Sequence, residues 1–253
     1  SNHIAIGTNS LDALTTSGDA IAIGYTAASA MTAGQSVLIG SKCAPVATTA
    51  ASPVGIGYEA FQYLTTGIYN TAVGIQSMNR ITTGGHNTAY GAFSLMYAQT
   101  SNYNTAVGYK ALGNEIVTGD HNTSVGYYAL RSNTSGYGNT AIGKDSGSEV
   151  TTGYANTLLG RATGKTMTTN QCCSFIGAMS GEYTEGNNNT AVGYYALRGS
   201  NGNTTGTNNT AIGYQAGDVL TTASECTFLG RDAGGGVTTG SYNTAIGAES
   251  MLG

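Results

Sequence analysis

The apolar and polar positions of the chain follow one short pattern, Asn-Thr-Ala-Val/Ile-Gly, which returns fifteen times. We number each repeat from its closing glycine, so that position −1 precedes this glycine and position +1 follows it. The repeat glycines are separated by 16, 17, 18 or 20 residues, most often by 17. Such a regular period predicts a solenoid of about 15 coils of about 17 residues, a single repeat domain over 1–253. We expect it to be a segment of a longer fibre.

The three residues that precede each repeat glycine have the pattern of a β-strand. Position −1 is Val, Ile or Leu, except for Tyr90, position −3 is Thr, Val, Ile or Ser, and position −2 is usually Ala. Successive side chains of a strand point to opposite faces, so positions −1 and −3 share one face and position −2 lies on the other. Alanine allows another backbone to approach closely. We therefore expect the position −2 alanines, among them Ala106 and Ala141, to face neighbouring subunits.

A second apolar-threonine segment follows in each coil, for example Leu64–Gly67 and Val150–Gly153. It predicts a second short β segment, which makes a flat, two-sided coil in an all-β, parallel β-solenoid. The two long spacings place their extra residues at Gly113–Ile116 and at Gly199–Thr204, where a surface loop can grow without disturbing the stack.

Asparagine recurs at position −4. In-register amides can hydrogen-bond from one coil to the next, so we interpret these residues as a structural ladder rather than as ligand contacts. The ladder residues are Asn70, Asn87, Asn104, Asn122, Asn139, Asn156, Asn189, Asn209 and Asn243.

Composition and charge exclude several classes of function. The chain has 39 Gly, no Trp and only 9% charged residues, which is not typical of a globular enzyme. Lys and Arg number 9 against 13 Asp and Glu, and there is no basic stretch for a phosphate backbone, so nucleic acid is not an expected partner. No apolar run approaches the roughly 18 residues that span a bilayer, so membrane insertion is not expected.

The chemically reactive residues form no recognisable catalytic set. His3, His86 and His121 lack a nucleophile and a carboxylate at a recognisable spacing, and the acids are scattered. We expect no enzyme activity, no catalytic residue, no metal and no cofactor. Cys173 and Cys226 lie three coils apart, about 14 Å, which is too far for a disulfide within one chain. The cysteines are expected to be unpaired.

Tyrosine often follows the repeat glycine, which predicts an aromatic stripe along one edge. These rings either stack on sugars or stack on each other and shield the edge. A receptor site, if the stripe carries one, is expected at the 20-residue coil, where a polar loop lies beside tyrosines. Its candidate residues are Tyr194, Tyr195, Arg198, Asn201, Asn203 and Tyr214.

The phrases Asp19–Gly24, Ser36–Gly40 and Asn70–Gly74 resemble the head repeats of YadA-like trimeric autotransporter adhesins. The longer form Asn-Thr-Ala-Val-Gly-Tyr-x-Ala-Leu, at 189–197, is similar to repeat arrays of bacteriophage and large-virus tail fibres. The resemblance implies a homotrimeric, left-handed β-roll that serves as a rigid structural segment in a virion tail fibre and contacts a host surface glycan or protein. The alternative is an adhesin head on a bacterial cell surface.

A second class of function is ice binding, because threonine columns on a flat β face can match an ice lattice. The adjacent Thr-Thr pair disfavours it, since only one of two neighbouring side chains can face outward. A surface hydrolase is the weakest hypothesis.

Overall fold

The computed structural model describes residues 2–15, 18–32, 34–199 and 204–252. Within these ranges the chain is all-β, with fifteen short strands and no helix. The strands and the turns between them form a parallel β-solenoid of about 14 turns with a repeat near 17 residues. Each strand occupies positions −3 to −1, and the first three strands also include position −4.

The chain divides into two compact units, Ser1–Asn122 and Thr123–Gly253, which use the same kind of coil. Strands of the first unit are β1 (His3–Ile6), β2 (Ala20–Ile23), β3 (Ser36–Ile39), β4 (Val54–Ile56), β5 (Thr71–Val73), β6 (Thr88–Tyr90) and β7 (Thr105–Val107). Strands of the second unit are β8 (Thr123–Val125), β9 (Thr140–Ile142), β10 (Thr157–Leu159), β11 (Ser174–Ile176), β12 (Thr190–Val192), β13 (Thr210–Ile212), β14 (Thr227–Leu229) and β15 (Thr244–Ile246).

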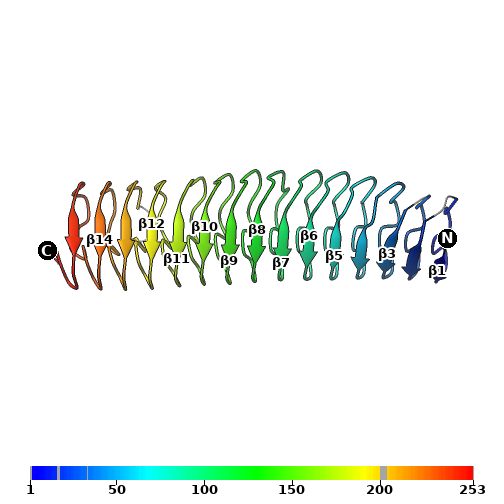
Figure 1. The fold of residues 1–253 in the computed structure, drawn as a ribbon, viewed down its shortest axis with the longest axis horizontal. Coiled ribbons are helices and arrows are strands. Elements are labelled where there is room, and N and C mark those ends of the chain that lie inside the picture. Colours follow the sequence, from blue (N-terminus) through cyan, green and yellow to red (C-terminus); the bar gives the residue numbers. More distant parts are fainter. Residues whose placement is uncertain (1, 16–17, 33, 200–203, 253) are drawn as a thin grey trace. The chain divides into compact units, whose positions relative to one another are not determined.

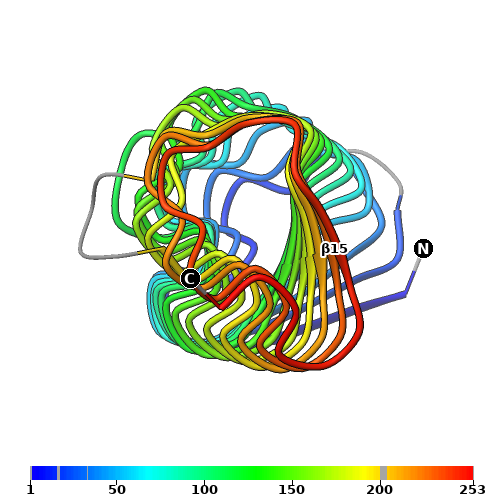
Figure 2. The ribbon, with the colours of Figure 1, turned by 90° about the vertical axis from the view of Figure 1, so that its left-hand side faces the viewer.

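Within each unit every strand pairs in parallel with the next strand along the chain (Figure 1). The register places equivalent positions side by side, so that Thr71 pairs with Thr88 and Ala72 with Ala89. Figure 2 shows this register along the stack, with successive coils of the second unit lying over one another up to β15. A feature that recurs in the sequence therefore becomes a continuous row in space.

The repeat glycine is required by both conformation and space. Gly74 has a φ of +133°, a value that residues with a side chain rarely adopt. A Cβ placed on Gly74 would lie 2.5 Å from the carbonyl oxygen of Gly91, the repeat glycine of the next coil. The glycines thus stack at a distance that no other residue permits.

Left-handed residues at positions +2 and +4 occur in every coil, and from β4 onward position −5 is left-handed as well. In one coil Gln76 has a φ of 52° and Met78 a φ of 47°, and Tyr69 has a φ of 55° before the same strand. Such a conformation is costly for residues other than glycine. Hydrogen bonds between coils offset this cost, as the N–H of Gln76 donates to Tyr58 O at 2.9 Å and that of Met78 to Ser94 O at 3.0 Å.

The prediction of a second β segment in each coil is wrong. The Thr-Thr segments form bends, and no described residue of these segments lies in a strand. Three successive N–H groups, those of Thr65, Thr66 and Gly67, converge on the Thr82 carbonyl oxygen at 3.0, 3.3 and 3.1 Å. A strand would direct neighbouring N–H groups to opposite sides, so this convergence requires a turn. The segment still joins one coil to the next.

The position −2 side chains point into the coil, which corrects the expectation that they face another subunit. Ala106 and Ala141 have no exposed surface within a single chain. Gly55 replaces alanine at this position, and a Cβ placed there would lie within 2.9 Å of the side chains of Leu38, Cys43 and Phe61. Alanine is used here because the coil is narrow and larger side chains enter its interior from the turn.

The side chains at positions −2 and +4 both point into this interior, and a large side chain at one position is accompanied by a small one at the other. Where position −2 is alanine, position +4 is often large, as in the pair Ala191 and Leu197, both fully buried. Where position −2 is Phe175, position +4 is Gly181, and a Cβ on that glycine would lie 2.2 Å from the ring. In these coils one large residue, placed on either wall, fills the space between the two positions, and where both are small, as at Ala141 and Gly147, the side chain of Leu158 from the next coil approaches instead.

Candidate functional site

The position −1 side chains form an apolar row on the outer face of each unit. Ile56, Ile142 and Ile212 keep 39%, 42% and 39% of their surface exposed, although each lies in the middle of a strand stack. Position −3 lies on the same face. Because the sheet repeats in register, each unit presents a flat face on which aliphatic side chains recur in every coil except that of Tyr90. Contiguous exposed apolar surface of this kind is typical of interaction sites.

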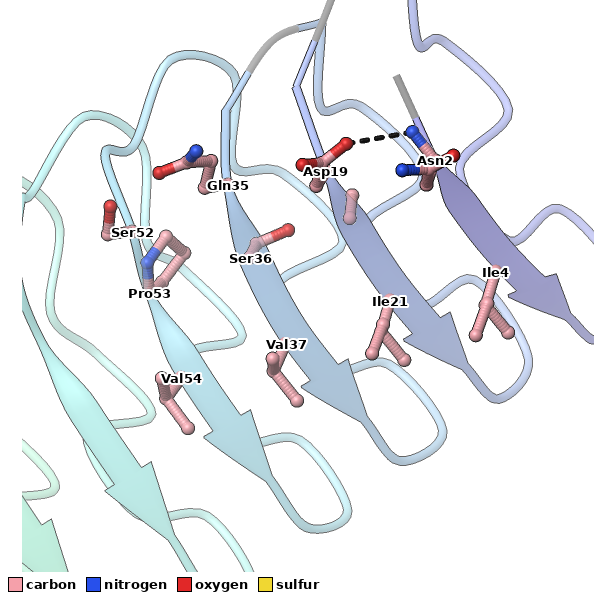
Figure 3. A pocket seen from close by; sticks show the side chains of 11 residues that line it. Asn2, Ile4, Asp19, Ile21, Gln35, Ser36, Val37, Ser52, Pro53 and Val54 are labelled. Carbon is pink, nitrogen blue, oxygen red and sulfur yellow. Dashed lines mark hydrogen bonds between the residues drawn. The ribbon is translucent and has the colours of Figure 1, made fainter.

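The outer face changes composition within the first unit. In the first four coils position −3 is also aliphatic, being Ile4, Ile21, Val37 and Val54, whereas later coils carry Thr or Ser there. These four side chains form the floor of a groove of about 500 Å³ across β1 to β4 (Figure 3). The switch from Ile or Val to Thr at position −3 is visible in the sequence and marks the end of the groove, although the groove itself was not among the predicted sites.

Polar groups border this groove at the start of the strands. The backbone N–H of Asn2 donates to Asp19 Oδ1 at 2.8 Å (Figure 3), and Gln35 and Ser52 occupy equivalent places in the next two coils. Asp19 forms no ion pair with any residue that the structure describes. No asparagine ladder is present here, because position −4 in these coils is His3, Ala20, Ser36 and Pro53.

The candidate receptor residues at the 20-residue coil lie together in the second unit. The rings of Tyr194 and Tyr195 are 4.0 Å apart between centroids, and Tyr214 stacks on Tyr194 at 5.8 Å. The guanidinium of Arg198 lies 4.4 Å from the centre of the Tyr195 ring. Asn201 and Asn203 lie outside the described residues. The structure thus brings four of the six predicted residues into one cluster.

Arg198 is bound to neighbouring residues of the protein. Its Nε donates to Glu182 Oε2 at 3.2 Å, and its guanidinium also lies 5.5 Å from the Tyr183 ring centre. Burial opposes the charge on Arg198, but hydrogen bonds to Glu182 and Tyr183 outweigh this effect and raise the pKa of Arg198. The sequence analysis missed Glu182 and Tyr183, which lie one coil earlier. Arg198 is therefore first a structural residue that holds this corner together.

The position −4 asparagines are buried and bond from coil to coil, except Asn243 in the last coil, which is partly exposed and donates to Gly240 O of its own coil at 2.7 Å. Asn87 Oδ1 accepts the backbone N–H of Asn104 at 2.9 Å, and Asn87 Nδ2 donates to Ser101 O at 2.8 Å. The same pattern occurs at Asn209, whose Oδ1 accepts the N–H of Cys226 at 2.9 Å and whose Nδ2 donates to Ala223 O at 2.9 Å. These amides satisfy main-chain groups inside the stack and are not exposed to a ligand.

Exposed aromatic rings at position −5 stack on each other in the first unit. The ring centroids of Tyr69 and His86 lie 5.2 Å apart, those of His86 and Tyr103 4.9 Å, and those of Tyr103 and His121 4.9 Å. Because each ring covers the face of the next, this corner offers ring edges rather than open faces. His86 and His121 thus have a packing role that their sequence positions alone did not reveal.

The cysteines are free, as predicted. Burial raises the pKa of Cys43 to about 12 and that of Cys173 to about 11, which suppresses the reactive thiolate form. Within the described ranges no cluster of three or more His, Cys, Asp or Glu residues could hold a metal ion. The same ranges include no helix that is long and apolar enough to cross a membrane.

No protein-family model, curated protein or solved structure matches this chain.

Proposed function

We propose that the chain is a rigid segment of a homotrimeric fibre, a left-handed β-roll that belongs to a viral tail fibre or to the head of a bacterial trimeric adhesin. The observation that carries this proposal is the half-exposed aliphatic row on the outer face of the strands. Such a row has no use in a protein surrounded by water, and it is costly to maintain along so many coils. A neighbouring copy that carries the same row is the simplest partner for it.

Energetics favour assembly through this face. Full burial of a Val, Leu or Ile side chain is worth about 1.5–3 kcal/mol, and the exposed position −1 residues, such as Ile56, Ile142 and Ile212, still have roughly two-fifths of their surface to bury. The gain is then about 1 kcal/mol for each such residue. Because the rows are in register and bear no charge, identical copies can align along several coils. The threefold symmetry and the handedness come from the resemblance to trimeric fibre repeats.

The test is the mass of the protein in solution, measured by sedimentation equilibrium. We expect a trimer for the native chain and a smaller species for the double variant Ile142→Lys, Ile176→Lys, which places two charges on the apolar row of the second unit. The matched control is Thr152→Lys, Thr169→Lys, at exposed positions of the Thr-Thr turns in the same unit. A monomeric native chain, or a double isoleucine variant with unchanged mass, would overturn the proposal.

Ice binding is a second candidate, and one observation favours it. From β5 onward position −3 is threonine in every strand except β11, and these threonines lie in register beside the position −1 aliphatic residues. A regular threonine column on a flat face is the surface that ice binding requires. The first four coils and the projecting Tyr90, which is 60% exposed, interrupt the column. A monomer with thermal hysteresis would favour this function over a fibre.

A further inference from the structure

A second hollow lies in the first unit, on the coil that exceeds the common period by one residue. It has a volume of about 250 Å³ and is built from two consecutive coils. Its lining residues are Phe93, Met96, Tyr97, Tyr109, Lys110, Gly113 and Asn114. It is separate from the groove over β1 to β4 and from the tyrosine cluster of the 20-residue coil.

The extra residue shapes this hollow. A Cβ on Gly113 would lie 2.1 Å from the carbonyl oxygen of Phe93, so the loop can rest against the preceding coil only because glycine stands there. Asn114, Glu115 and Ile116 then continue outward as exposed residues. The ring of Tyr109 meets the ring of Phe93 edge to face, with centroids 5.8 Å apart and planes at 87°. The result is a fixed aromatic corner beside a polar loop.

The cations at this corner have no acidic partner. Lys110 Nζ lies 5.9 Å from the Tyr109 ring centre, and the guanidinium of Arg80 lies 5.9 Å from the ring centre of Tyr97. Neither cation forms an ion pair with any described residue, whereas Lys42, Lys144, Arg198 and Arg231 each do. In a chain with net charge −4, two neighbouring cations that form no ion pair favour an anionic ligand.

We infer that this hollow binds one ring of an acidic saccharide. A tyrosine combines a flat apolar face with a polar edge, which matches the C–H face and the hydroxyl edge of a sugar. Lys110 pairs with the sugar carboxylate, and the amide oxygen of Asn114 accepts a hydrogen bond from a sugar hydroxyl. The volume is below the roughly 300–1,000 Å³ of pockets for drug-sized molecules, which suits a single ring.

The carboxylate of Glu115 lies beside Asn114 and opposes the binding of an anion. Its Oε1 accepts a hydrogen bond from Asn114 Nδ2 at 3.4 Å, so a negative charge lies at the rim of the hollow. An acidic ligand is repelled by this carboxylate, and removal of the charge should strengthen binding. The inference deepens the receptor contact of the proposed fibre and assigns it to a different coil. Binding and mass are measured separately, so either proposal can fail without the other.

The experiment uses the full chain, with D-glucuronate and D-glucose as probes in saturation-transfer NMR titrations at low salt. We expect binding of glucuronate and at least tenfold weaker binding of glucose. Lys110→Gln should weaken glucuronate binding about tenfold or more, and Glu115→Gln should strengthen it. Lys165→Gln, a lysine of the second unit, is the matched control and should change nothing. Unaltered mass and circular dichroism show that each variant is folded.

The outcomes separate the alternatives. Equal binding of glucuronate by the native chain and by Lys110→Gln would overturn the inference, as would the absence of binding. Tighter binding of triglutamate than of glucuronate would assign the corner to an acidic peptide instead and would also overturn it. Deletion of 199–201, which restores the 17-residue period in the 20-residue coil, should leave glucuronate binding intact. Loss of glucuronate binding in that deletion variant would overturn the inference and assign the receptor site to the tyrosine cluster.

Discussion

Two buried asparagines of the second unit differ in how well their amides are satisfied. Asn139 occupies the ladder position, where its Nδ2 donates to Gly153 O at 2.8 Å and its Oδ1 accepts from the Asn156 backbone and side chain at 3.1 and 3.0 Å. Asn133 occupies position +7, where most other coils carry Leu, Ile, Val, Met or Ala, and neither its Nδ2 nor its Oδ1 has a hydrogen-bond partner among the described residues. Both residues are fully buried, so burial alone does not decide how much each contributes to the stability of the fold.

The same substitution should therefore have opposite effects at these two positions. Asn133→Val removes two unsatisfied polar atoms and introduces the residue that the next coil carries as Val150, so we expect the free energy of unfolding to rise by about 1–3 kcal/mol. Asn139→Val leaves main-chain groups of the next coil unsatisfied and should lower it by about 2–4 kcal/mol. Urea denaturation followed by circular dichroism measures both. A loss of stability in Asn133→Val would mean that this amide has a partner, such as a buried water.

At the scale of strands and turns, the sequence predicted where each strand lies but not which face is inside. Alternation of Ala with Val or Ile shows that the two faces of the strand differ. It does not show which of the two faces points into the coil. Alanine suggested a close contact with another subunit. In the structure Ala72 and Met78, which lie six residues apart, are both fully buried, so the large side chain enters the interior from the turn and the strand contributes only alanine. A pattern confined to the strand cannot contain this information.

The turns were harder to predict for a related reason. Threonine and an aliphatic residue favour β structure, so Leu64–Gly67 had the composition of a strand. Its conformation is instead set by the Thr82 carbonyl of the next coil, which three N–H groups share.

Prediction of the candidate sites from the sequence met the same limit. Tyr194 and Arg198 are adjacent to the long loop in sequence and were found, but Glu182 is brought to Arg198 only by stacking of coils.

The exchange of volume between strand and turn can be tested with a double-mutant cycle. Phe175→Ala removes the ring that fills one coil and should cost about 3–5 kcal/mol. Gly181→Leu forces a side chain into the same space and should be at least as harmful, because its Cβ alone would lie 2.2 Å from the ring. The double variant recreates the arrangement of Ala191 and Leu197 in the next coil and should recover most of the native stability. Additive losses in urea denaturation would contradict a shared volume.

At the scale of the whole molecule, the distribution of charge separates two kinds of interaction. Only 9% of the residues are charged, and the described ion pairs lie at the turns, such as Lys42 with Glu59 and Arg231 with Glu249. The outer faces of the strands carry aliphatic and hydroxyl side chains. The proposed assembly through those faces rests on apolar burial, whereas the proposed recognition at the Lys110 corner rests on charge.

Sodium chloride should therefore weaken ligand binding but leave the assembly intact. The Debye length falls from about 10 Å at 0.1 M to about 3 Å at 1 M salt, so glucuronate binding should weaken several-fold over this range. Apolar burial is not screened, so the mass from sedimentation equilibrium should stay that of a trimer in sodium chloride, and in sodium sulfate the assembly should become more stable. Dissociation of the proposed trimer at 1 M sodium chloride would show that charged turns, rather than the aliphatic rows, hold the copies together.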